Sequence, residues 1–297
     1  MRKGLGIALS VLGGFLVVLG LLAQFYAPGQ LMKTPLDVDT TTRLAGTAEL
    51  SDGTGGTDTF PVKAFSVTRA DSERSDDDVV VFQNSTCLVK DEGEVDGCVS
   101  ADDPDGRLLS ATTDNFATDR VEATAVNDPK YLPASAEDKE GLVNKWPFNA
   151  EKKTYPYWDG TADEAVDAVY ERTEELDGTD LYVYKVTVDP VPTELPGGAS
   201  GTFSSEKEIW VEPTTGSIIN QVDQQQRIDE DGNPFLLVDL AFTDEQRKSS
   251  LEEAQSSLSS LNLIRKTLPL VGLIVGIQAL IAGIFLLLGG RRKSATA

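Results

Sequence analysis

The side chains that could perform acid–base or nucleophilic chemistry in this 297-residue chain are mainly carboxylates, because the sequence contains no histidine. Histidine is the commonest general base, the central member of the Ser-His-Asp triad and a usual ligand of catalytic zinc. Paired carboxylates alone can hydrolyse glycans, but the 48 Asp and Glu residues offer no pair that stands out. We therefore expect a protein that is not an enzyme and binds no cofactor, with a carboxylate-dependent enzyme acting on glycans as an alternative.

The two cysteines, Cys87 and Cys98, are eleven positions apart. Outside the cytoplasm such a pair is most simply a disulfide that closes a hairpin. A redox role is less favoured because the chain has no C-x-x-C motif. Acidic residues between the two cysteines suggest calcium, but their spacing misses the EF-hand register, so we predict no metal site.

An aromatic stretch at 141–160 is the most distinctive segment between the two ends of the chain. It contains Trp146, Phe148, Tyr155, Tyr157 and Trp158. Aromatic rings bury a large apolar area and keep a polar edge, so these residues are our candidate ligand-binding wall for a sugar or an acyl chain. The alternative is that they are core side chains of an irregular connection between strands.

Three lysines, Lys145, Lys152 and Lys153, lie in the same stretch of an otherwise acidic segment. They could face anionic lipid headgroups, or they could offset the charge of neighbouring carboxylates. We favour the second interpretation.

Two uncharged apolar runs, Gly4–Tyr26 and Leu268–Gly290, are each long enough to cross a bilayer as a helix. Gln278, near the middle of the second run, is tolerable as a group that hydrogen-bonds to another helix. A cleaved signal peptide is the alternative for the first run, but the run is long and no good cleavage site follows it.

Basic residues flank the apolar runs, and the flanks at the two chain ends carry more of them than the inner flanks. This bias predicts a two-pass membrane protein with both termini in the cytoplasm. The predicted order is a membrane helix with a short cytoplasmic end at 1–27, an extracytoplasmic domain at 28–242, a stalk helix at 243–267, a membrane helix at 268–290 and a cytoplasmic tail at 291–297.

The net charge of −22 is concentrated in the extracytoplasmic segment, because all acidic residues lie between Asp37 and Glu253. Nucleic-acid binding is driven by neutralising phosphates, so an acidic domain should not bind nucleic acid. The charge is most simply that of a solvated surface.

Short runs rich in β-branched and aromatic residues alternate with turn clusters and predict nine strands. These are 38–50, 60–70, 78–89, 107–116, 120–126, 181–189, 203–212, 217–228 and 234–242. A capping box at Thr161–Glu164 predicts one helix that ends before Gly178. A second capping box, Thr243-x-x-Gln246, starts the stalk helix, whose apolar stripe contains Leu251, Ala254, Leu258 and Leu261.

The fold class is therefore mostly β, an antiparallel sandwich or barrel-like domain with one or two helices, flanked by two transmembrane helices. We expect the stalk stripe to pack on its own domain.

The segment G-L-x-x-K-W-P-F-x-x-E-K-K-T-Y-P-Y-W-D, the later I-W-V-E-P-T-T-G-S-I-I and the two terminal spans together resemble the actinobacterial porin PorA family. The resemblance covers nearly the whole chain. It implies a two-span protein of the cell envelope, linked to walls rich in mycolates or lipoglycans, and of unknown function. It carries over no catalytic residue.

The leading functional hypothesis is a non-enzymatic envelope protein whose outer domain binds or presents a lipid or lipoglycan intermediate. One alternative is a structural or assembly partner of a membrane enzyme of envelope biosynthesis, contacted through the spans and the stalk. Another is a pore, as the family label suggests. A membrane β-barrel is disfavoured, since its strands would need a lipid-facing apolar band and these strands are acidic.

Overall fold

The computed structural model describes residues 2–288, which form two compact units. One unit consists of the described residues up to Lys33 together with those from Ser256 onward, and the other is Thr34–Gln255. The predicted cytoplasmic tail 291–297 and the last two residues of the second span lie outside the described residues.

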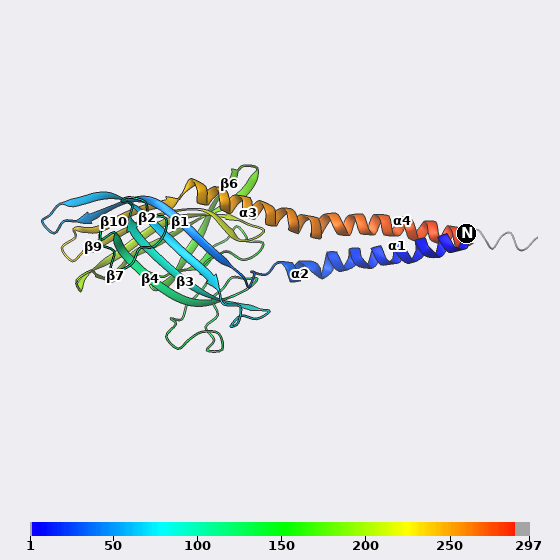
Figure 1. Cartoon of the computed structure of the whole chain (residues 1–297), viewed down its shortest axis with the longest axis horizontal. Coiled ribbons are helices and arrows are strands. Elements are labelled where there is room, and N and C mark those ends of the chain that lie inside the picture. Colours follow the sequence, from blue (N-terminus) through cyan, green and yellow to red (C-terminus); the bar gives the residue numbers. More distant parts are fainter. Residues whose placement is uncertain (1, 289–297) are drawn as a thin grey trace, which may run out of the picture. The chain divides into compact units, whose positions relative to one another are not determined.

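The first unit is helical (Figure 1). It contains α1 (Arg2–Phe25), the short α2 (Ala27–Leu31) and α4 (Leu268–Leu288). By length and hydropathy, two helices could cross a membrane, α1 and the apolar end of the continuous helix 244–288. This confirms the predicted flanking helices.

A π-helical turn, Leu263–Thr267, joins α3 (Asp244–Asn262) to α4. It ends two residues before Pro269, whose ring would clash with the carbonyl four residues earlier, that of Arg265, in a regular α-helix. The wider π-turn relieves that crowding, so the helix continues through the proline.

The second unit is built on one ten-stranded antiparallel sheet in the order β4-β3-β2-β1-β10-β9-β8-β7-β6-β5. The strands are β1 (Asp39–Ser51), β2 (Thr57–Ala70), β3 (Val79–Lys90), β4 (Leu108–Asp119), β5 (Tyr155–Asp159), β6 (Glu164–Leu176), β7 (Thr179–Leu195), β8 (Ala199–Glu212), β9 (Ser217–Asp229) and β10 (Pro234–Phe242). Strands that are consecutive in the sequence pair with each other, except β4 and β5, which are the two terminal strands, and β1 pairs with β10; the sheet is therefore essentially a meander. The mostly-β prediction is confirmed as a single curled sheet (Figure 1).

The helix predicted from Thr161 to Leu176 is wrong, because this segment is a turn followed by β6. The Asp159 carboxylate accepts hydrogen bonds from the backbone N–H of Thr161 and Ala162 at 3.0 Å, which builds a turn in place of a helix start. The following residues pair with β7, with Ala168 opposite Val186. Non-local pairing thus overrode a four-residue capping pattern.

The strand predicted at 120–126 is also wrong. The Asp119 carboxylate accepts hydrogen bonds from the N–H groups of Val121 and Glu122 at 2.7 Å, and Ala123 has a positive φ of 58°. Only isolated bridges follow, including Thr118 with Ala125. Conversely, β5 was not predicted, because its five residues contain a proline and sit inside the irregular aromatic stretch.

The two faces of the sheet are covered differently. On the inner face, apolar clusters form around Trp146 and Tyr184 and around Val62 and Leu240. Asp159 on β5 and Lys207 on β8 form an ion pair on this face, although β6 and β7 lie between their strands. The contact shows that the sheet curves toward this face, which is therefore concave.

On the opposite face, the loop closed by the Cys87–Cys98 disulfide covers Phe65 and Val89. The predicted disulfide is therefore present. It joins β3 to the loop that leads into β4.

The start of α3 is fixed to the sheet by its capping residues. The Thr243 hydroxyl accepts a hydrogen bond from the Gln246 N–H at 3.1 Å, as the capping box predicts. The Gln246 side chain instead accepts from the backbone N–H of Arg43 on β1 at 3.1 Å. Further along, Leu251 and Ala254 are buried in a cluster with sheet residues, so this part of the stalk packs on its own domain as expected.

Candidate functional site

The apolar helices α1 and α4 pack antiparallel with their backbones in contact. The buried residues of each helix recur every seven positions, and all but one are glycines: Gly6, Gly13 and Gly20 on α1, and Pro269, Gly276 and Gly283 on α4. A Cβ added at Gly13 would lie 2.6 Å from the carbonyl oxygen of Gly276, and one at Gly6 would lie 3.1 Å from that of Gly283. Such close approach is the usual way in which membrane helices gain packing energy.

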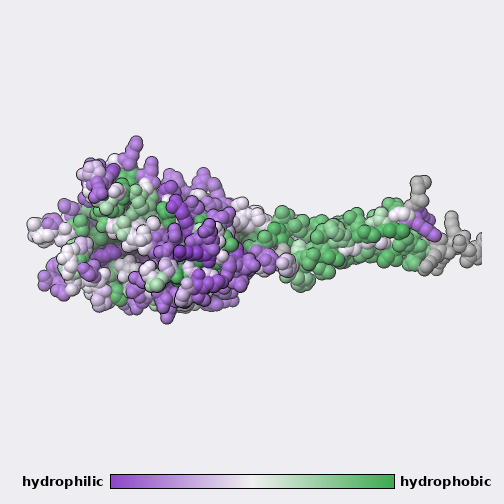
Figure 2. All heavy atoms as spheres, turned by 60° about the horizontal axis from the view of Figure 1, so that its bottom comes forward, coloured by the Kyte–Doolittle hydropathy of each residue, from purple (hydrophilic) through white to green (hydrophobic). Residues whose placement is uncertain are grey.

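The outward surface of this helical pair is almost entirely apolar (Figure 2). Exposed side chains such as Phe15, Val18, Ile277 and Phe285 cover it. This surface is suited to a lipid environment, in which the helical backbone satisfies its own hydrogen bonds.

Gln278 interrupts the apolar surface in the middle of α4. Its side chain is exposed and lies two residues beyond Gly276, about 200° around the helix from the contact with α1. Ser10 is satisfied within α1, because its hydroxyl donates to the carbonyl oxygen of Gly6 at 2.9 Å. Gln24 lies at the end of α1, so Gln278 is the mid-span polar group of the described helices that faces away from the helical pair.

The five aromatic residues of the predicted ligand-binding wall are placed largely in the core. Trp146 is fully buried, Tyr155 and Trp158 are buried, and Phe148 and Tyr157 are half-buried. The Trp146 ring lies 5.5 Å from that of Tyr157 and 5.0 Å from that of Tyr184, between ring centroids. Three of the five rings are thus buried core side chains, and Phe148 and Tyr157 keep only part of their surface exposed.

Hydrogen bonds and strand direction explain this arrangement. The Tyr184 hydroxyl donates to the carbonyl oxygen of Glu151, and the Tyr155 hydroxyl accepts from the N–H of the same residue. Trp158 points to the other side of β5, where the Lys139 ammonium lies 5.2 Å from its ring centroid. The aromatic stretch is therefore a plug that holds an irregular connection against the sheet.

The three lysines of the same stretch do not form one basic surface. The Lys145 ammonium lies 3.9 Å from the Phe148 ring centroid and 3.4 Å from the Thr34 hydroxyl, and burial lowers its pKa to about 8. Lys152 lies over the Tyr182 ring, whereas Lys153 pairs with Glu151 at 2.7 Å.

A charged cluster that sequence reasoning missed lies on the inner face of β5, β8 and β9. The Lys207 ammonium pairs with the Asp159 carboxylate, and Asp223 lies opposite Lys207 in the strand register. Burial opposes charge on both partners of the pair, but the facing charges prevail, so the pKa of Asp159 falls and that of Lys207 rises. Burial raises the pKa of Asp223.

Two polar atoms beside this ion pair have no hydrogen-bond partner among the described residues. They are the Ser205 hydroxyl and one carboxylate oxygen of Asp223, both in residues at least nine-tenths buried. Arg227, on the same face, contacts the Phe203 ring and has no ion pair within the described part of the chain. The inner face thus holds unsatisfied hydrogen-bonding capacity.

A sequence signal for this cluster did exist. The alternation from Phe203 to Val211 places Ser205 and Lys207 on the same face as the apolar Phe203 and Ile209. A lysine at a core-facing strand position indicates a buried ion pair. The partners on β5 and β9 could not be identified without the fold.

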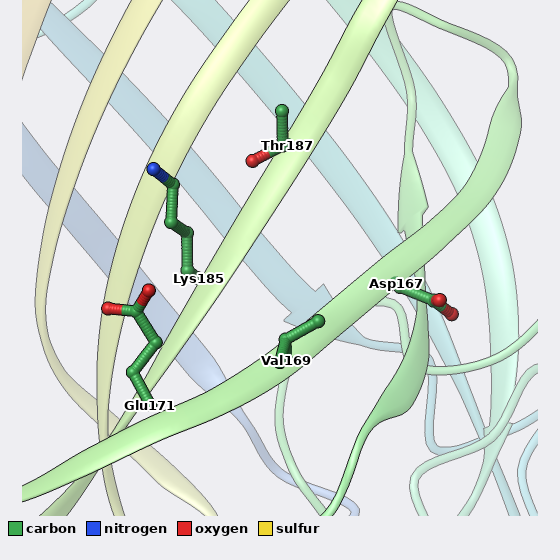
Figure 3. A pocket seen from close by; sticks show the side chains of 5 residues that line it. All are labelled: Asp167, Val169, Glu171, Lys185 and Thr187. Carbon is green, nitrogen blue, oxygen red and sulfur yellow. The ribbon is translucent and has the colours of Figure 1, made fainter.

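A shallow pocket of about 310 Å³ lies on the opposite face of β6 and β7 (Figure 3). It is lined by Asp167, Val169, Glu171, Lys185 and Thr187. The Lys185 amine is already paired with Glu206 at 3.0 Å. What remains is a rim of carboxylates around one exposed apolar side chain, which suits a small cationic group better than an anion.

The sequence is similar to a known protein family and to two named proteins. The profile of the family described as "Porin PorA" matches residues 5–285. A protein named "Porin PorA" from Corynebacterium amycolatum is 27% identical over 225 residues, covering 64% of this chain and 58% of that protein. A second "Porin PorA", from Corynebacterium resistens, is 22% identical and covers 76% of this chain and 75% of that protein. The chain thus spans less than two thirds of the length of the first of these relatives.

Proposed function

Because the chain belongs to the Porin PorA family, we propose that copies of its helical pair associate in a membrane and form a pore lined by Gln278. Family membership and the two apolar terminal helices indicate a membrane protein. The proposal goes further and assigns the pore to the helices.

The position of Gln278 carries this proposal. A carboxamide that faces lipid in mid-span lacks hydrogen-bond partners, and association with another helix supplies them. Such interhelical hydrogen bonds are worth about 0.6–2 kcal/mol each. Because Gln278 lies on the side of α4 away from α1, its partners belong to other copies, and a ring of these side chains gives a polar lining.

The sheet is a poor candidate for the membrane-crossing element. A membrane barrel needs an outward apolar band. The face of β6–β8 opposite the core instead carries Asp167, Glu171, Lys185 and Glu206. We therefore assign ion conduction to the helices and propose that the sheet lies outside the membrane, in water.

Reconstitution in planar bilayers tests the proposal. The wild-type full-length chain should give discrete conductance steps, and Gln278→Leu should abolish them because the lining becomes apolar. Gln24→Leu is the matched control, since it removes the same group at the end of α1, and it should retain conductance. Unchanged conductance in Gln278→Leu would remove Gln278 from the pore.

A second candidate function is the binding of a lipid or lipoglycan, at residues other than the predicted aromatic wall. The Ser205 hydroxyl, one oxygen of Asp223 and the Arg227 guanidinium, which lack a hydrogen-bond or ion-pair partner among residues 2–288, could hold the hydroxyl-rich head of a lipid or lipoglycan at the inner face. This candidate site does not use Trp146 of the predicted aromatic wall, because that side chain is fully buried.

Mass spectrometry of lipids that co-purify with the full chain tests this second candidate. Enrichment of a glycosylated lipid that is lost in Asp223→Asn but kept in Asp167→Asn, a carboxylate of the opposite face, would favour binding. Bulk membrane lipid alone in all three proteins would count against it. The third hypothesis, an assembly partner of an envelope enzyme, remains a prediction.

A further inference from the structure

One border of the sheet is an unprotected strand edge. β4 is the terminal strand of the ten, and its backbone hydrogen bonds over residues 108–116 run to β3 alone within the described chain. Ser110, Ala111, Thr112 and Thr113 are all exposed. Half of the N–H and C=O groups of such a strand point away from its partner, so this edge offers a row of unpaired donors and acceptors.

The composition of this edge is unusual for the chain. No charged residue and no proline occurs from Leu108 to Thr113, although the protein carries a net charge of −22. The part of β6 that extends beyond β5, by contrast, carries Glu171, Arg172, Glu174 and Glu175. Charges of this kind are a usual protection against strand pairing, and the β4 edge lacks them.

We propose that the β4 edge pairs with the same edge of a second copy of this chain, so that two sheets join antiparallel across Leu108–Thr113. Charge selects this occupant: two acidic copies repel each other across their carboxylate-rich faces, but not across an uncharged strand. Self-pairing of one strand about a two-fold axis is self-complementary and closes at two copies. The choice of a second copy rests in part on the proposed function, which requires association of the chain.

The experiment uses the full chain in liposomes at low protein density. Both native cysteines are in the disulfide, so Ala111→Cys introduces the single free thiol. Gln226→Cys is the control, because Gln226 is equally exposed but lies on β9, which has a partner strand on both sides. Mild oxidation should give at least fivefold more covalent dimer with Ala111→Cys than with Gln226→Cys.

A second variant tests the same edge without cross-linking. Ala111→Lys places like charges close together across the paired edges, and native mass spectrometry should show the loss of the dimeric species seen for wild type. Equal cross-linking of the two cysteine variants, a cross-link of Ala111→Cys to a different protein, or a wild-type chain with no dimer would overturn the proposal.

The cross-link is also measured in a Gln278→Leu background. Dimer that persists while conductance is lost supports the edge independently of the pore. If wild type conducts but Ala111→Cys gives no covalent dimer, the proposed pairing of β4 edges is wrong, whereas the proposed pore is not contradicted.

Discussion

Gly13 of α1 and Gly276 of α4 bring the two helix backbones into direct contact, so that a Cβ on Gly13 would lie 2.6 Å from the carbonyl oxygen of Gly276. The heptad spacing of small residues on both helices continues this contact along the pair. The helical pair is thus a packed structure in its own right, and its packing can be tested at single positions.

Gly13→Val should weaken the helical pair by about 1–3 kcal/mol, because the added atoms meet backbone that cannot move without separating the helices. Gly14→Val is the matched control, since a Cβ at Gly14 meets nothing within 4 Å. The measurement is thermal unfolding in detergent, followed by helix circular dichroism at fixed detergent concentration. Equal melting of the two variants would show that the close contact is not the source of stability.

Loss of the disulfide should destabilise the sheet unit by about 3 kcal/mol, as expected for a short closed loop. The bond holds the loop over Phe65 and Val89, so its removal also exposes apolar surface. Urea unfolding of Cys87→Ser/Cys98→Ser, followed by tryptophan fluorescence, gives the change, and wild type in reductant should match the variant. A change below about 1 kcal/mol would mean that packing alone holds the loop.

Lys145 should make the stability of the sheet unit rise with pH between about 8 and 10.5. Burial lowers its folded pKa to about 8 from the ordinary lysine value of 10.5, so the unfolded chain binds more protons in this window, and stability increases as pH rises through it. Below pH 8 the cost of burying the ammonium is fully present. Lys145→Met should be more stable at pH 7 and should lose the rise that wild type shows in urea titrations. A variant that keeps the rise would assign it to another group.

Much of the architecture could be predicted from local patterns. Both candidate spans could be predicted from the length of the uncharged apolar runs. Eight of the nine predicted strands are present, because alternating side chains and turn residues mark them in the sequence. The failures have two physical causes, namely local hydrogen bonds to the Asp119 side chain at 120–126 and non-local strand pairing. The capping box at Thr161 was overridden by pairing of Ala168 with Val186, which a sequence window does not contain.

The candidate sites were harder to predict, because burial is a non-local property. In the sequence, Trp146 lies in a stretch interrupted by prolines, which favoured a binding role. Only the fold shows that its ring packs against Tyr184. Lys207 disturbs an apolar alternation and could have been identified as a buried ion, but its partner Asp159 lies 48 positions earlier. Gln278 was visible in the sequence, whereas its outward direction required the contact of α4 with α1.

The ion selectivity of Gln278→Glu tests the central claim most directly. A carboxylate ring in a pore attracts cations, as in cation channels. In bilayers with a salt gradient, the reversal potential of Gln278→Glu should shift toward the cation equilibrium potential relative to wild type, and Gln24→Glu should shift it much less. Conductance whose reversal potential is unchanged by Gln278→Glu, or the absence of any conductance from the wild-type chain, would contradict the account.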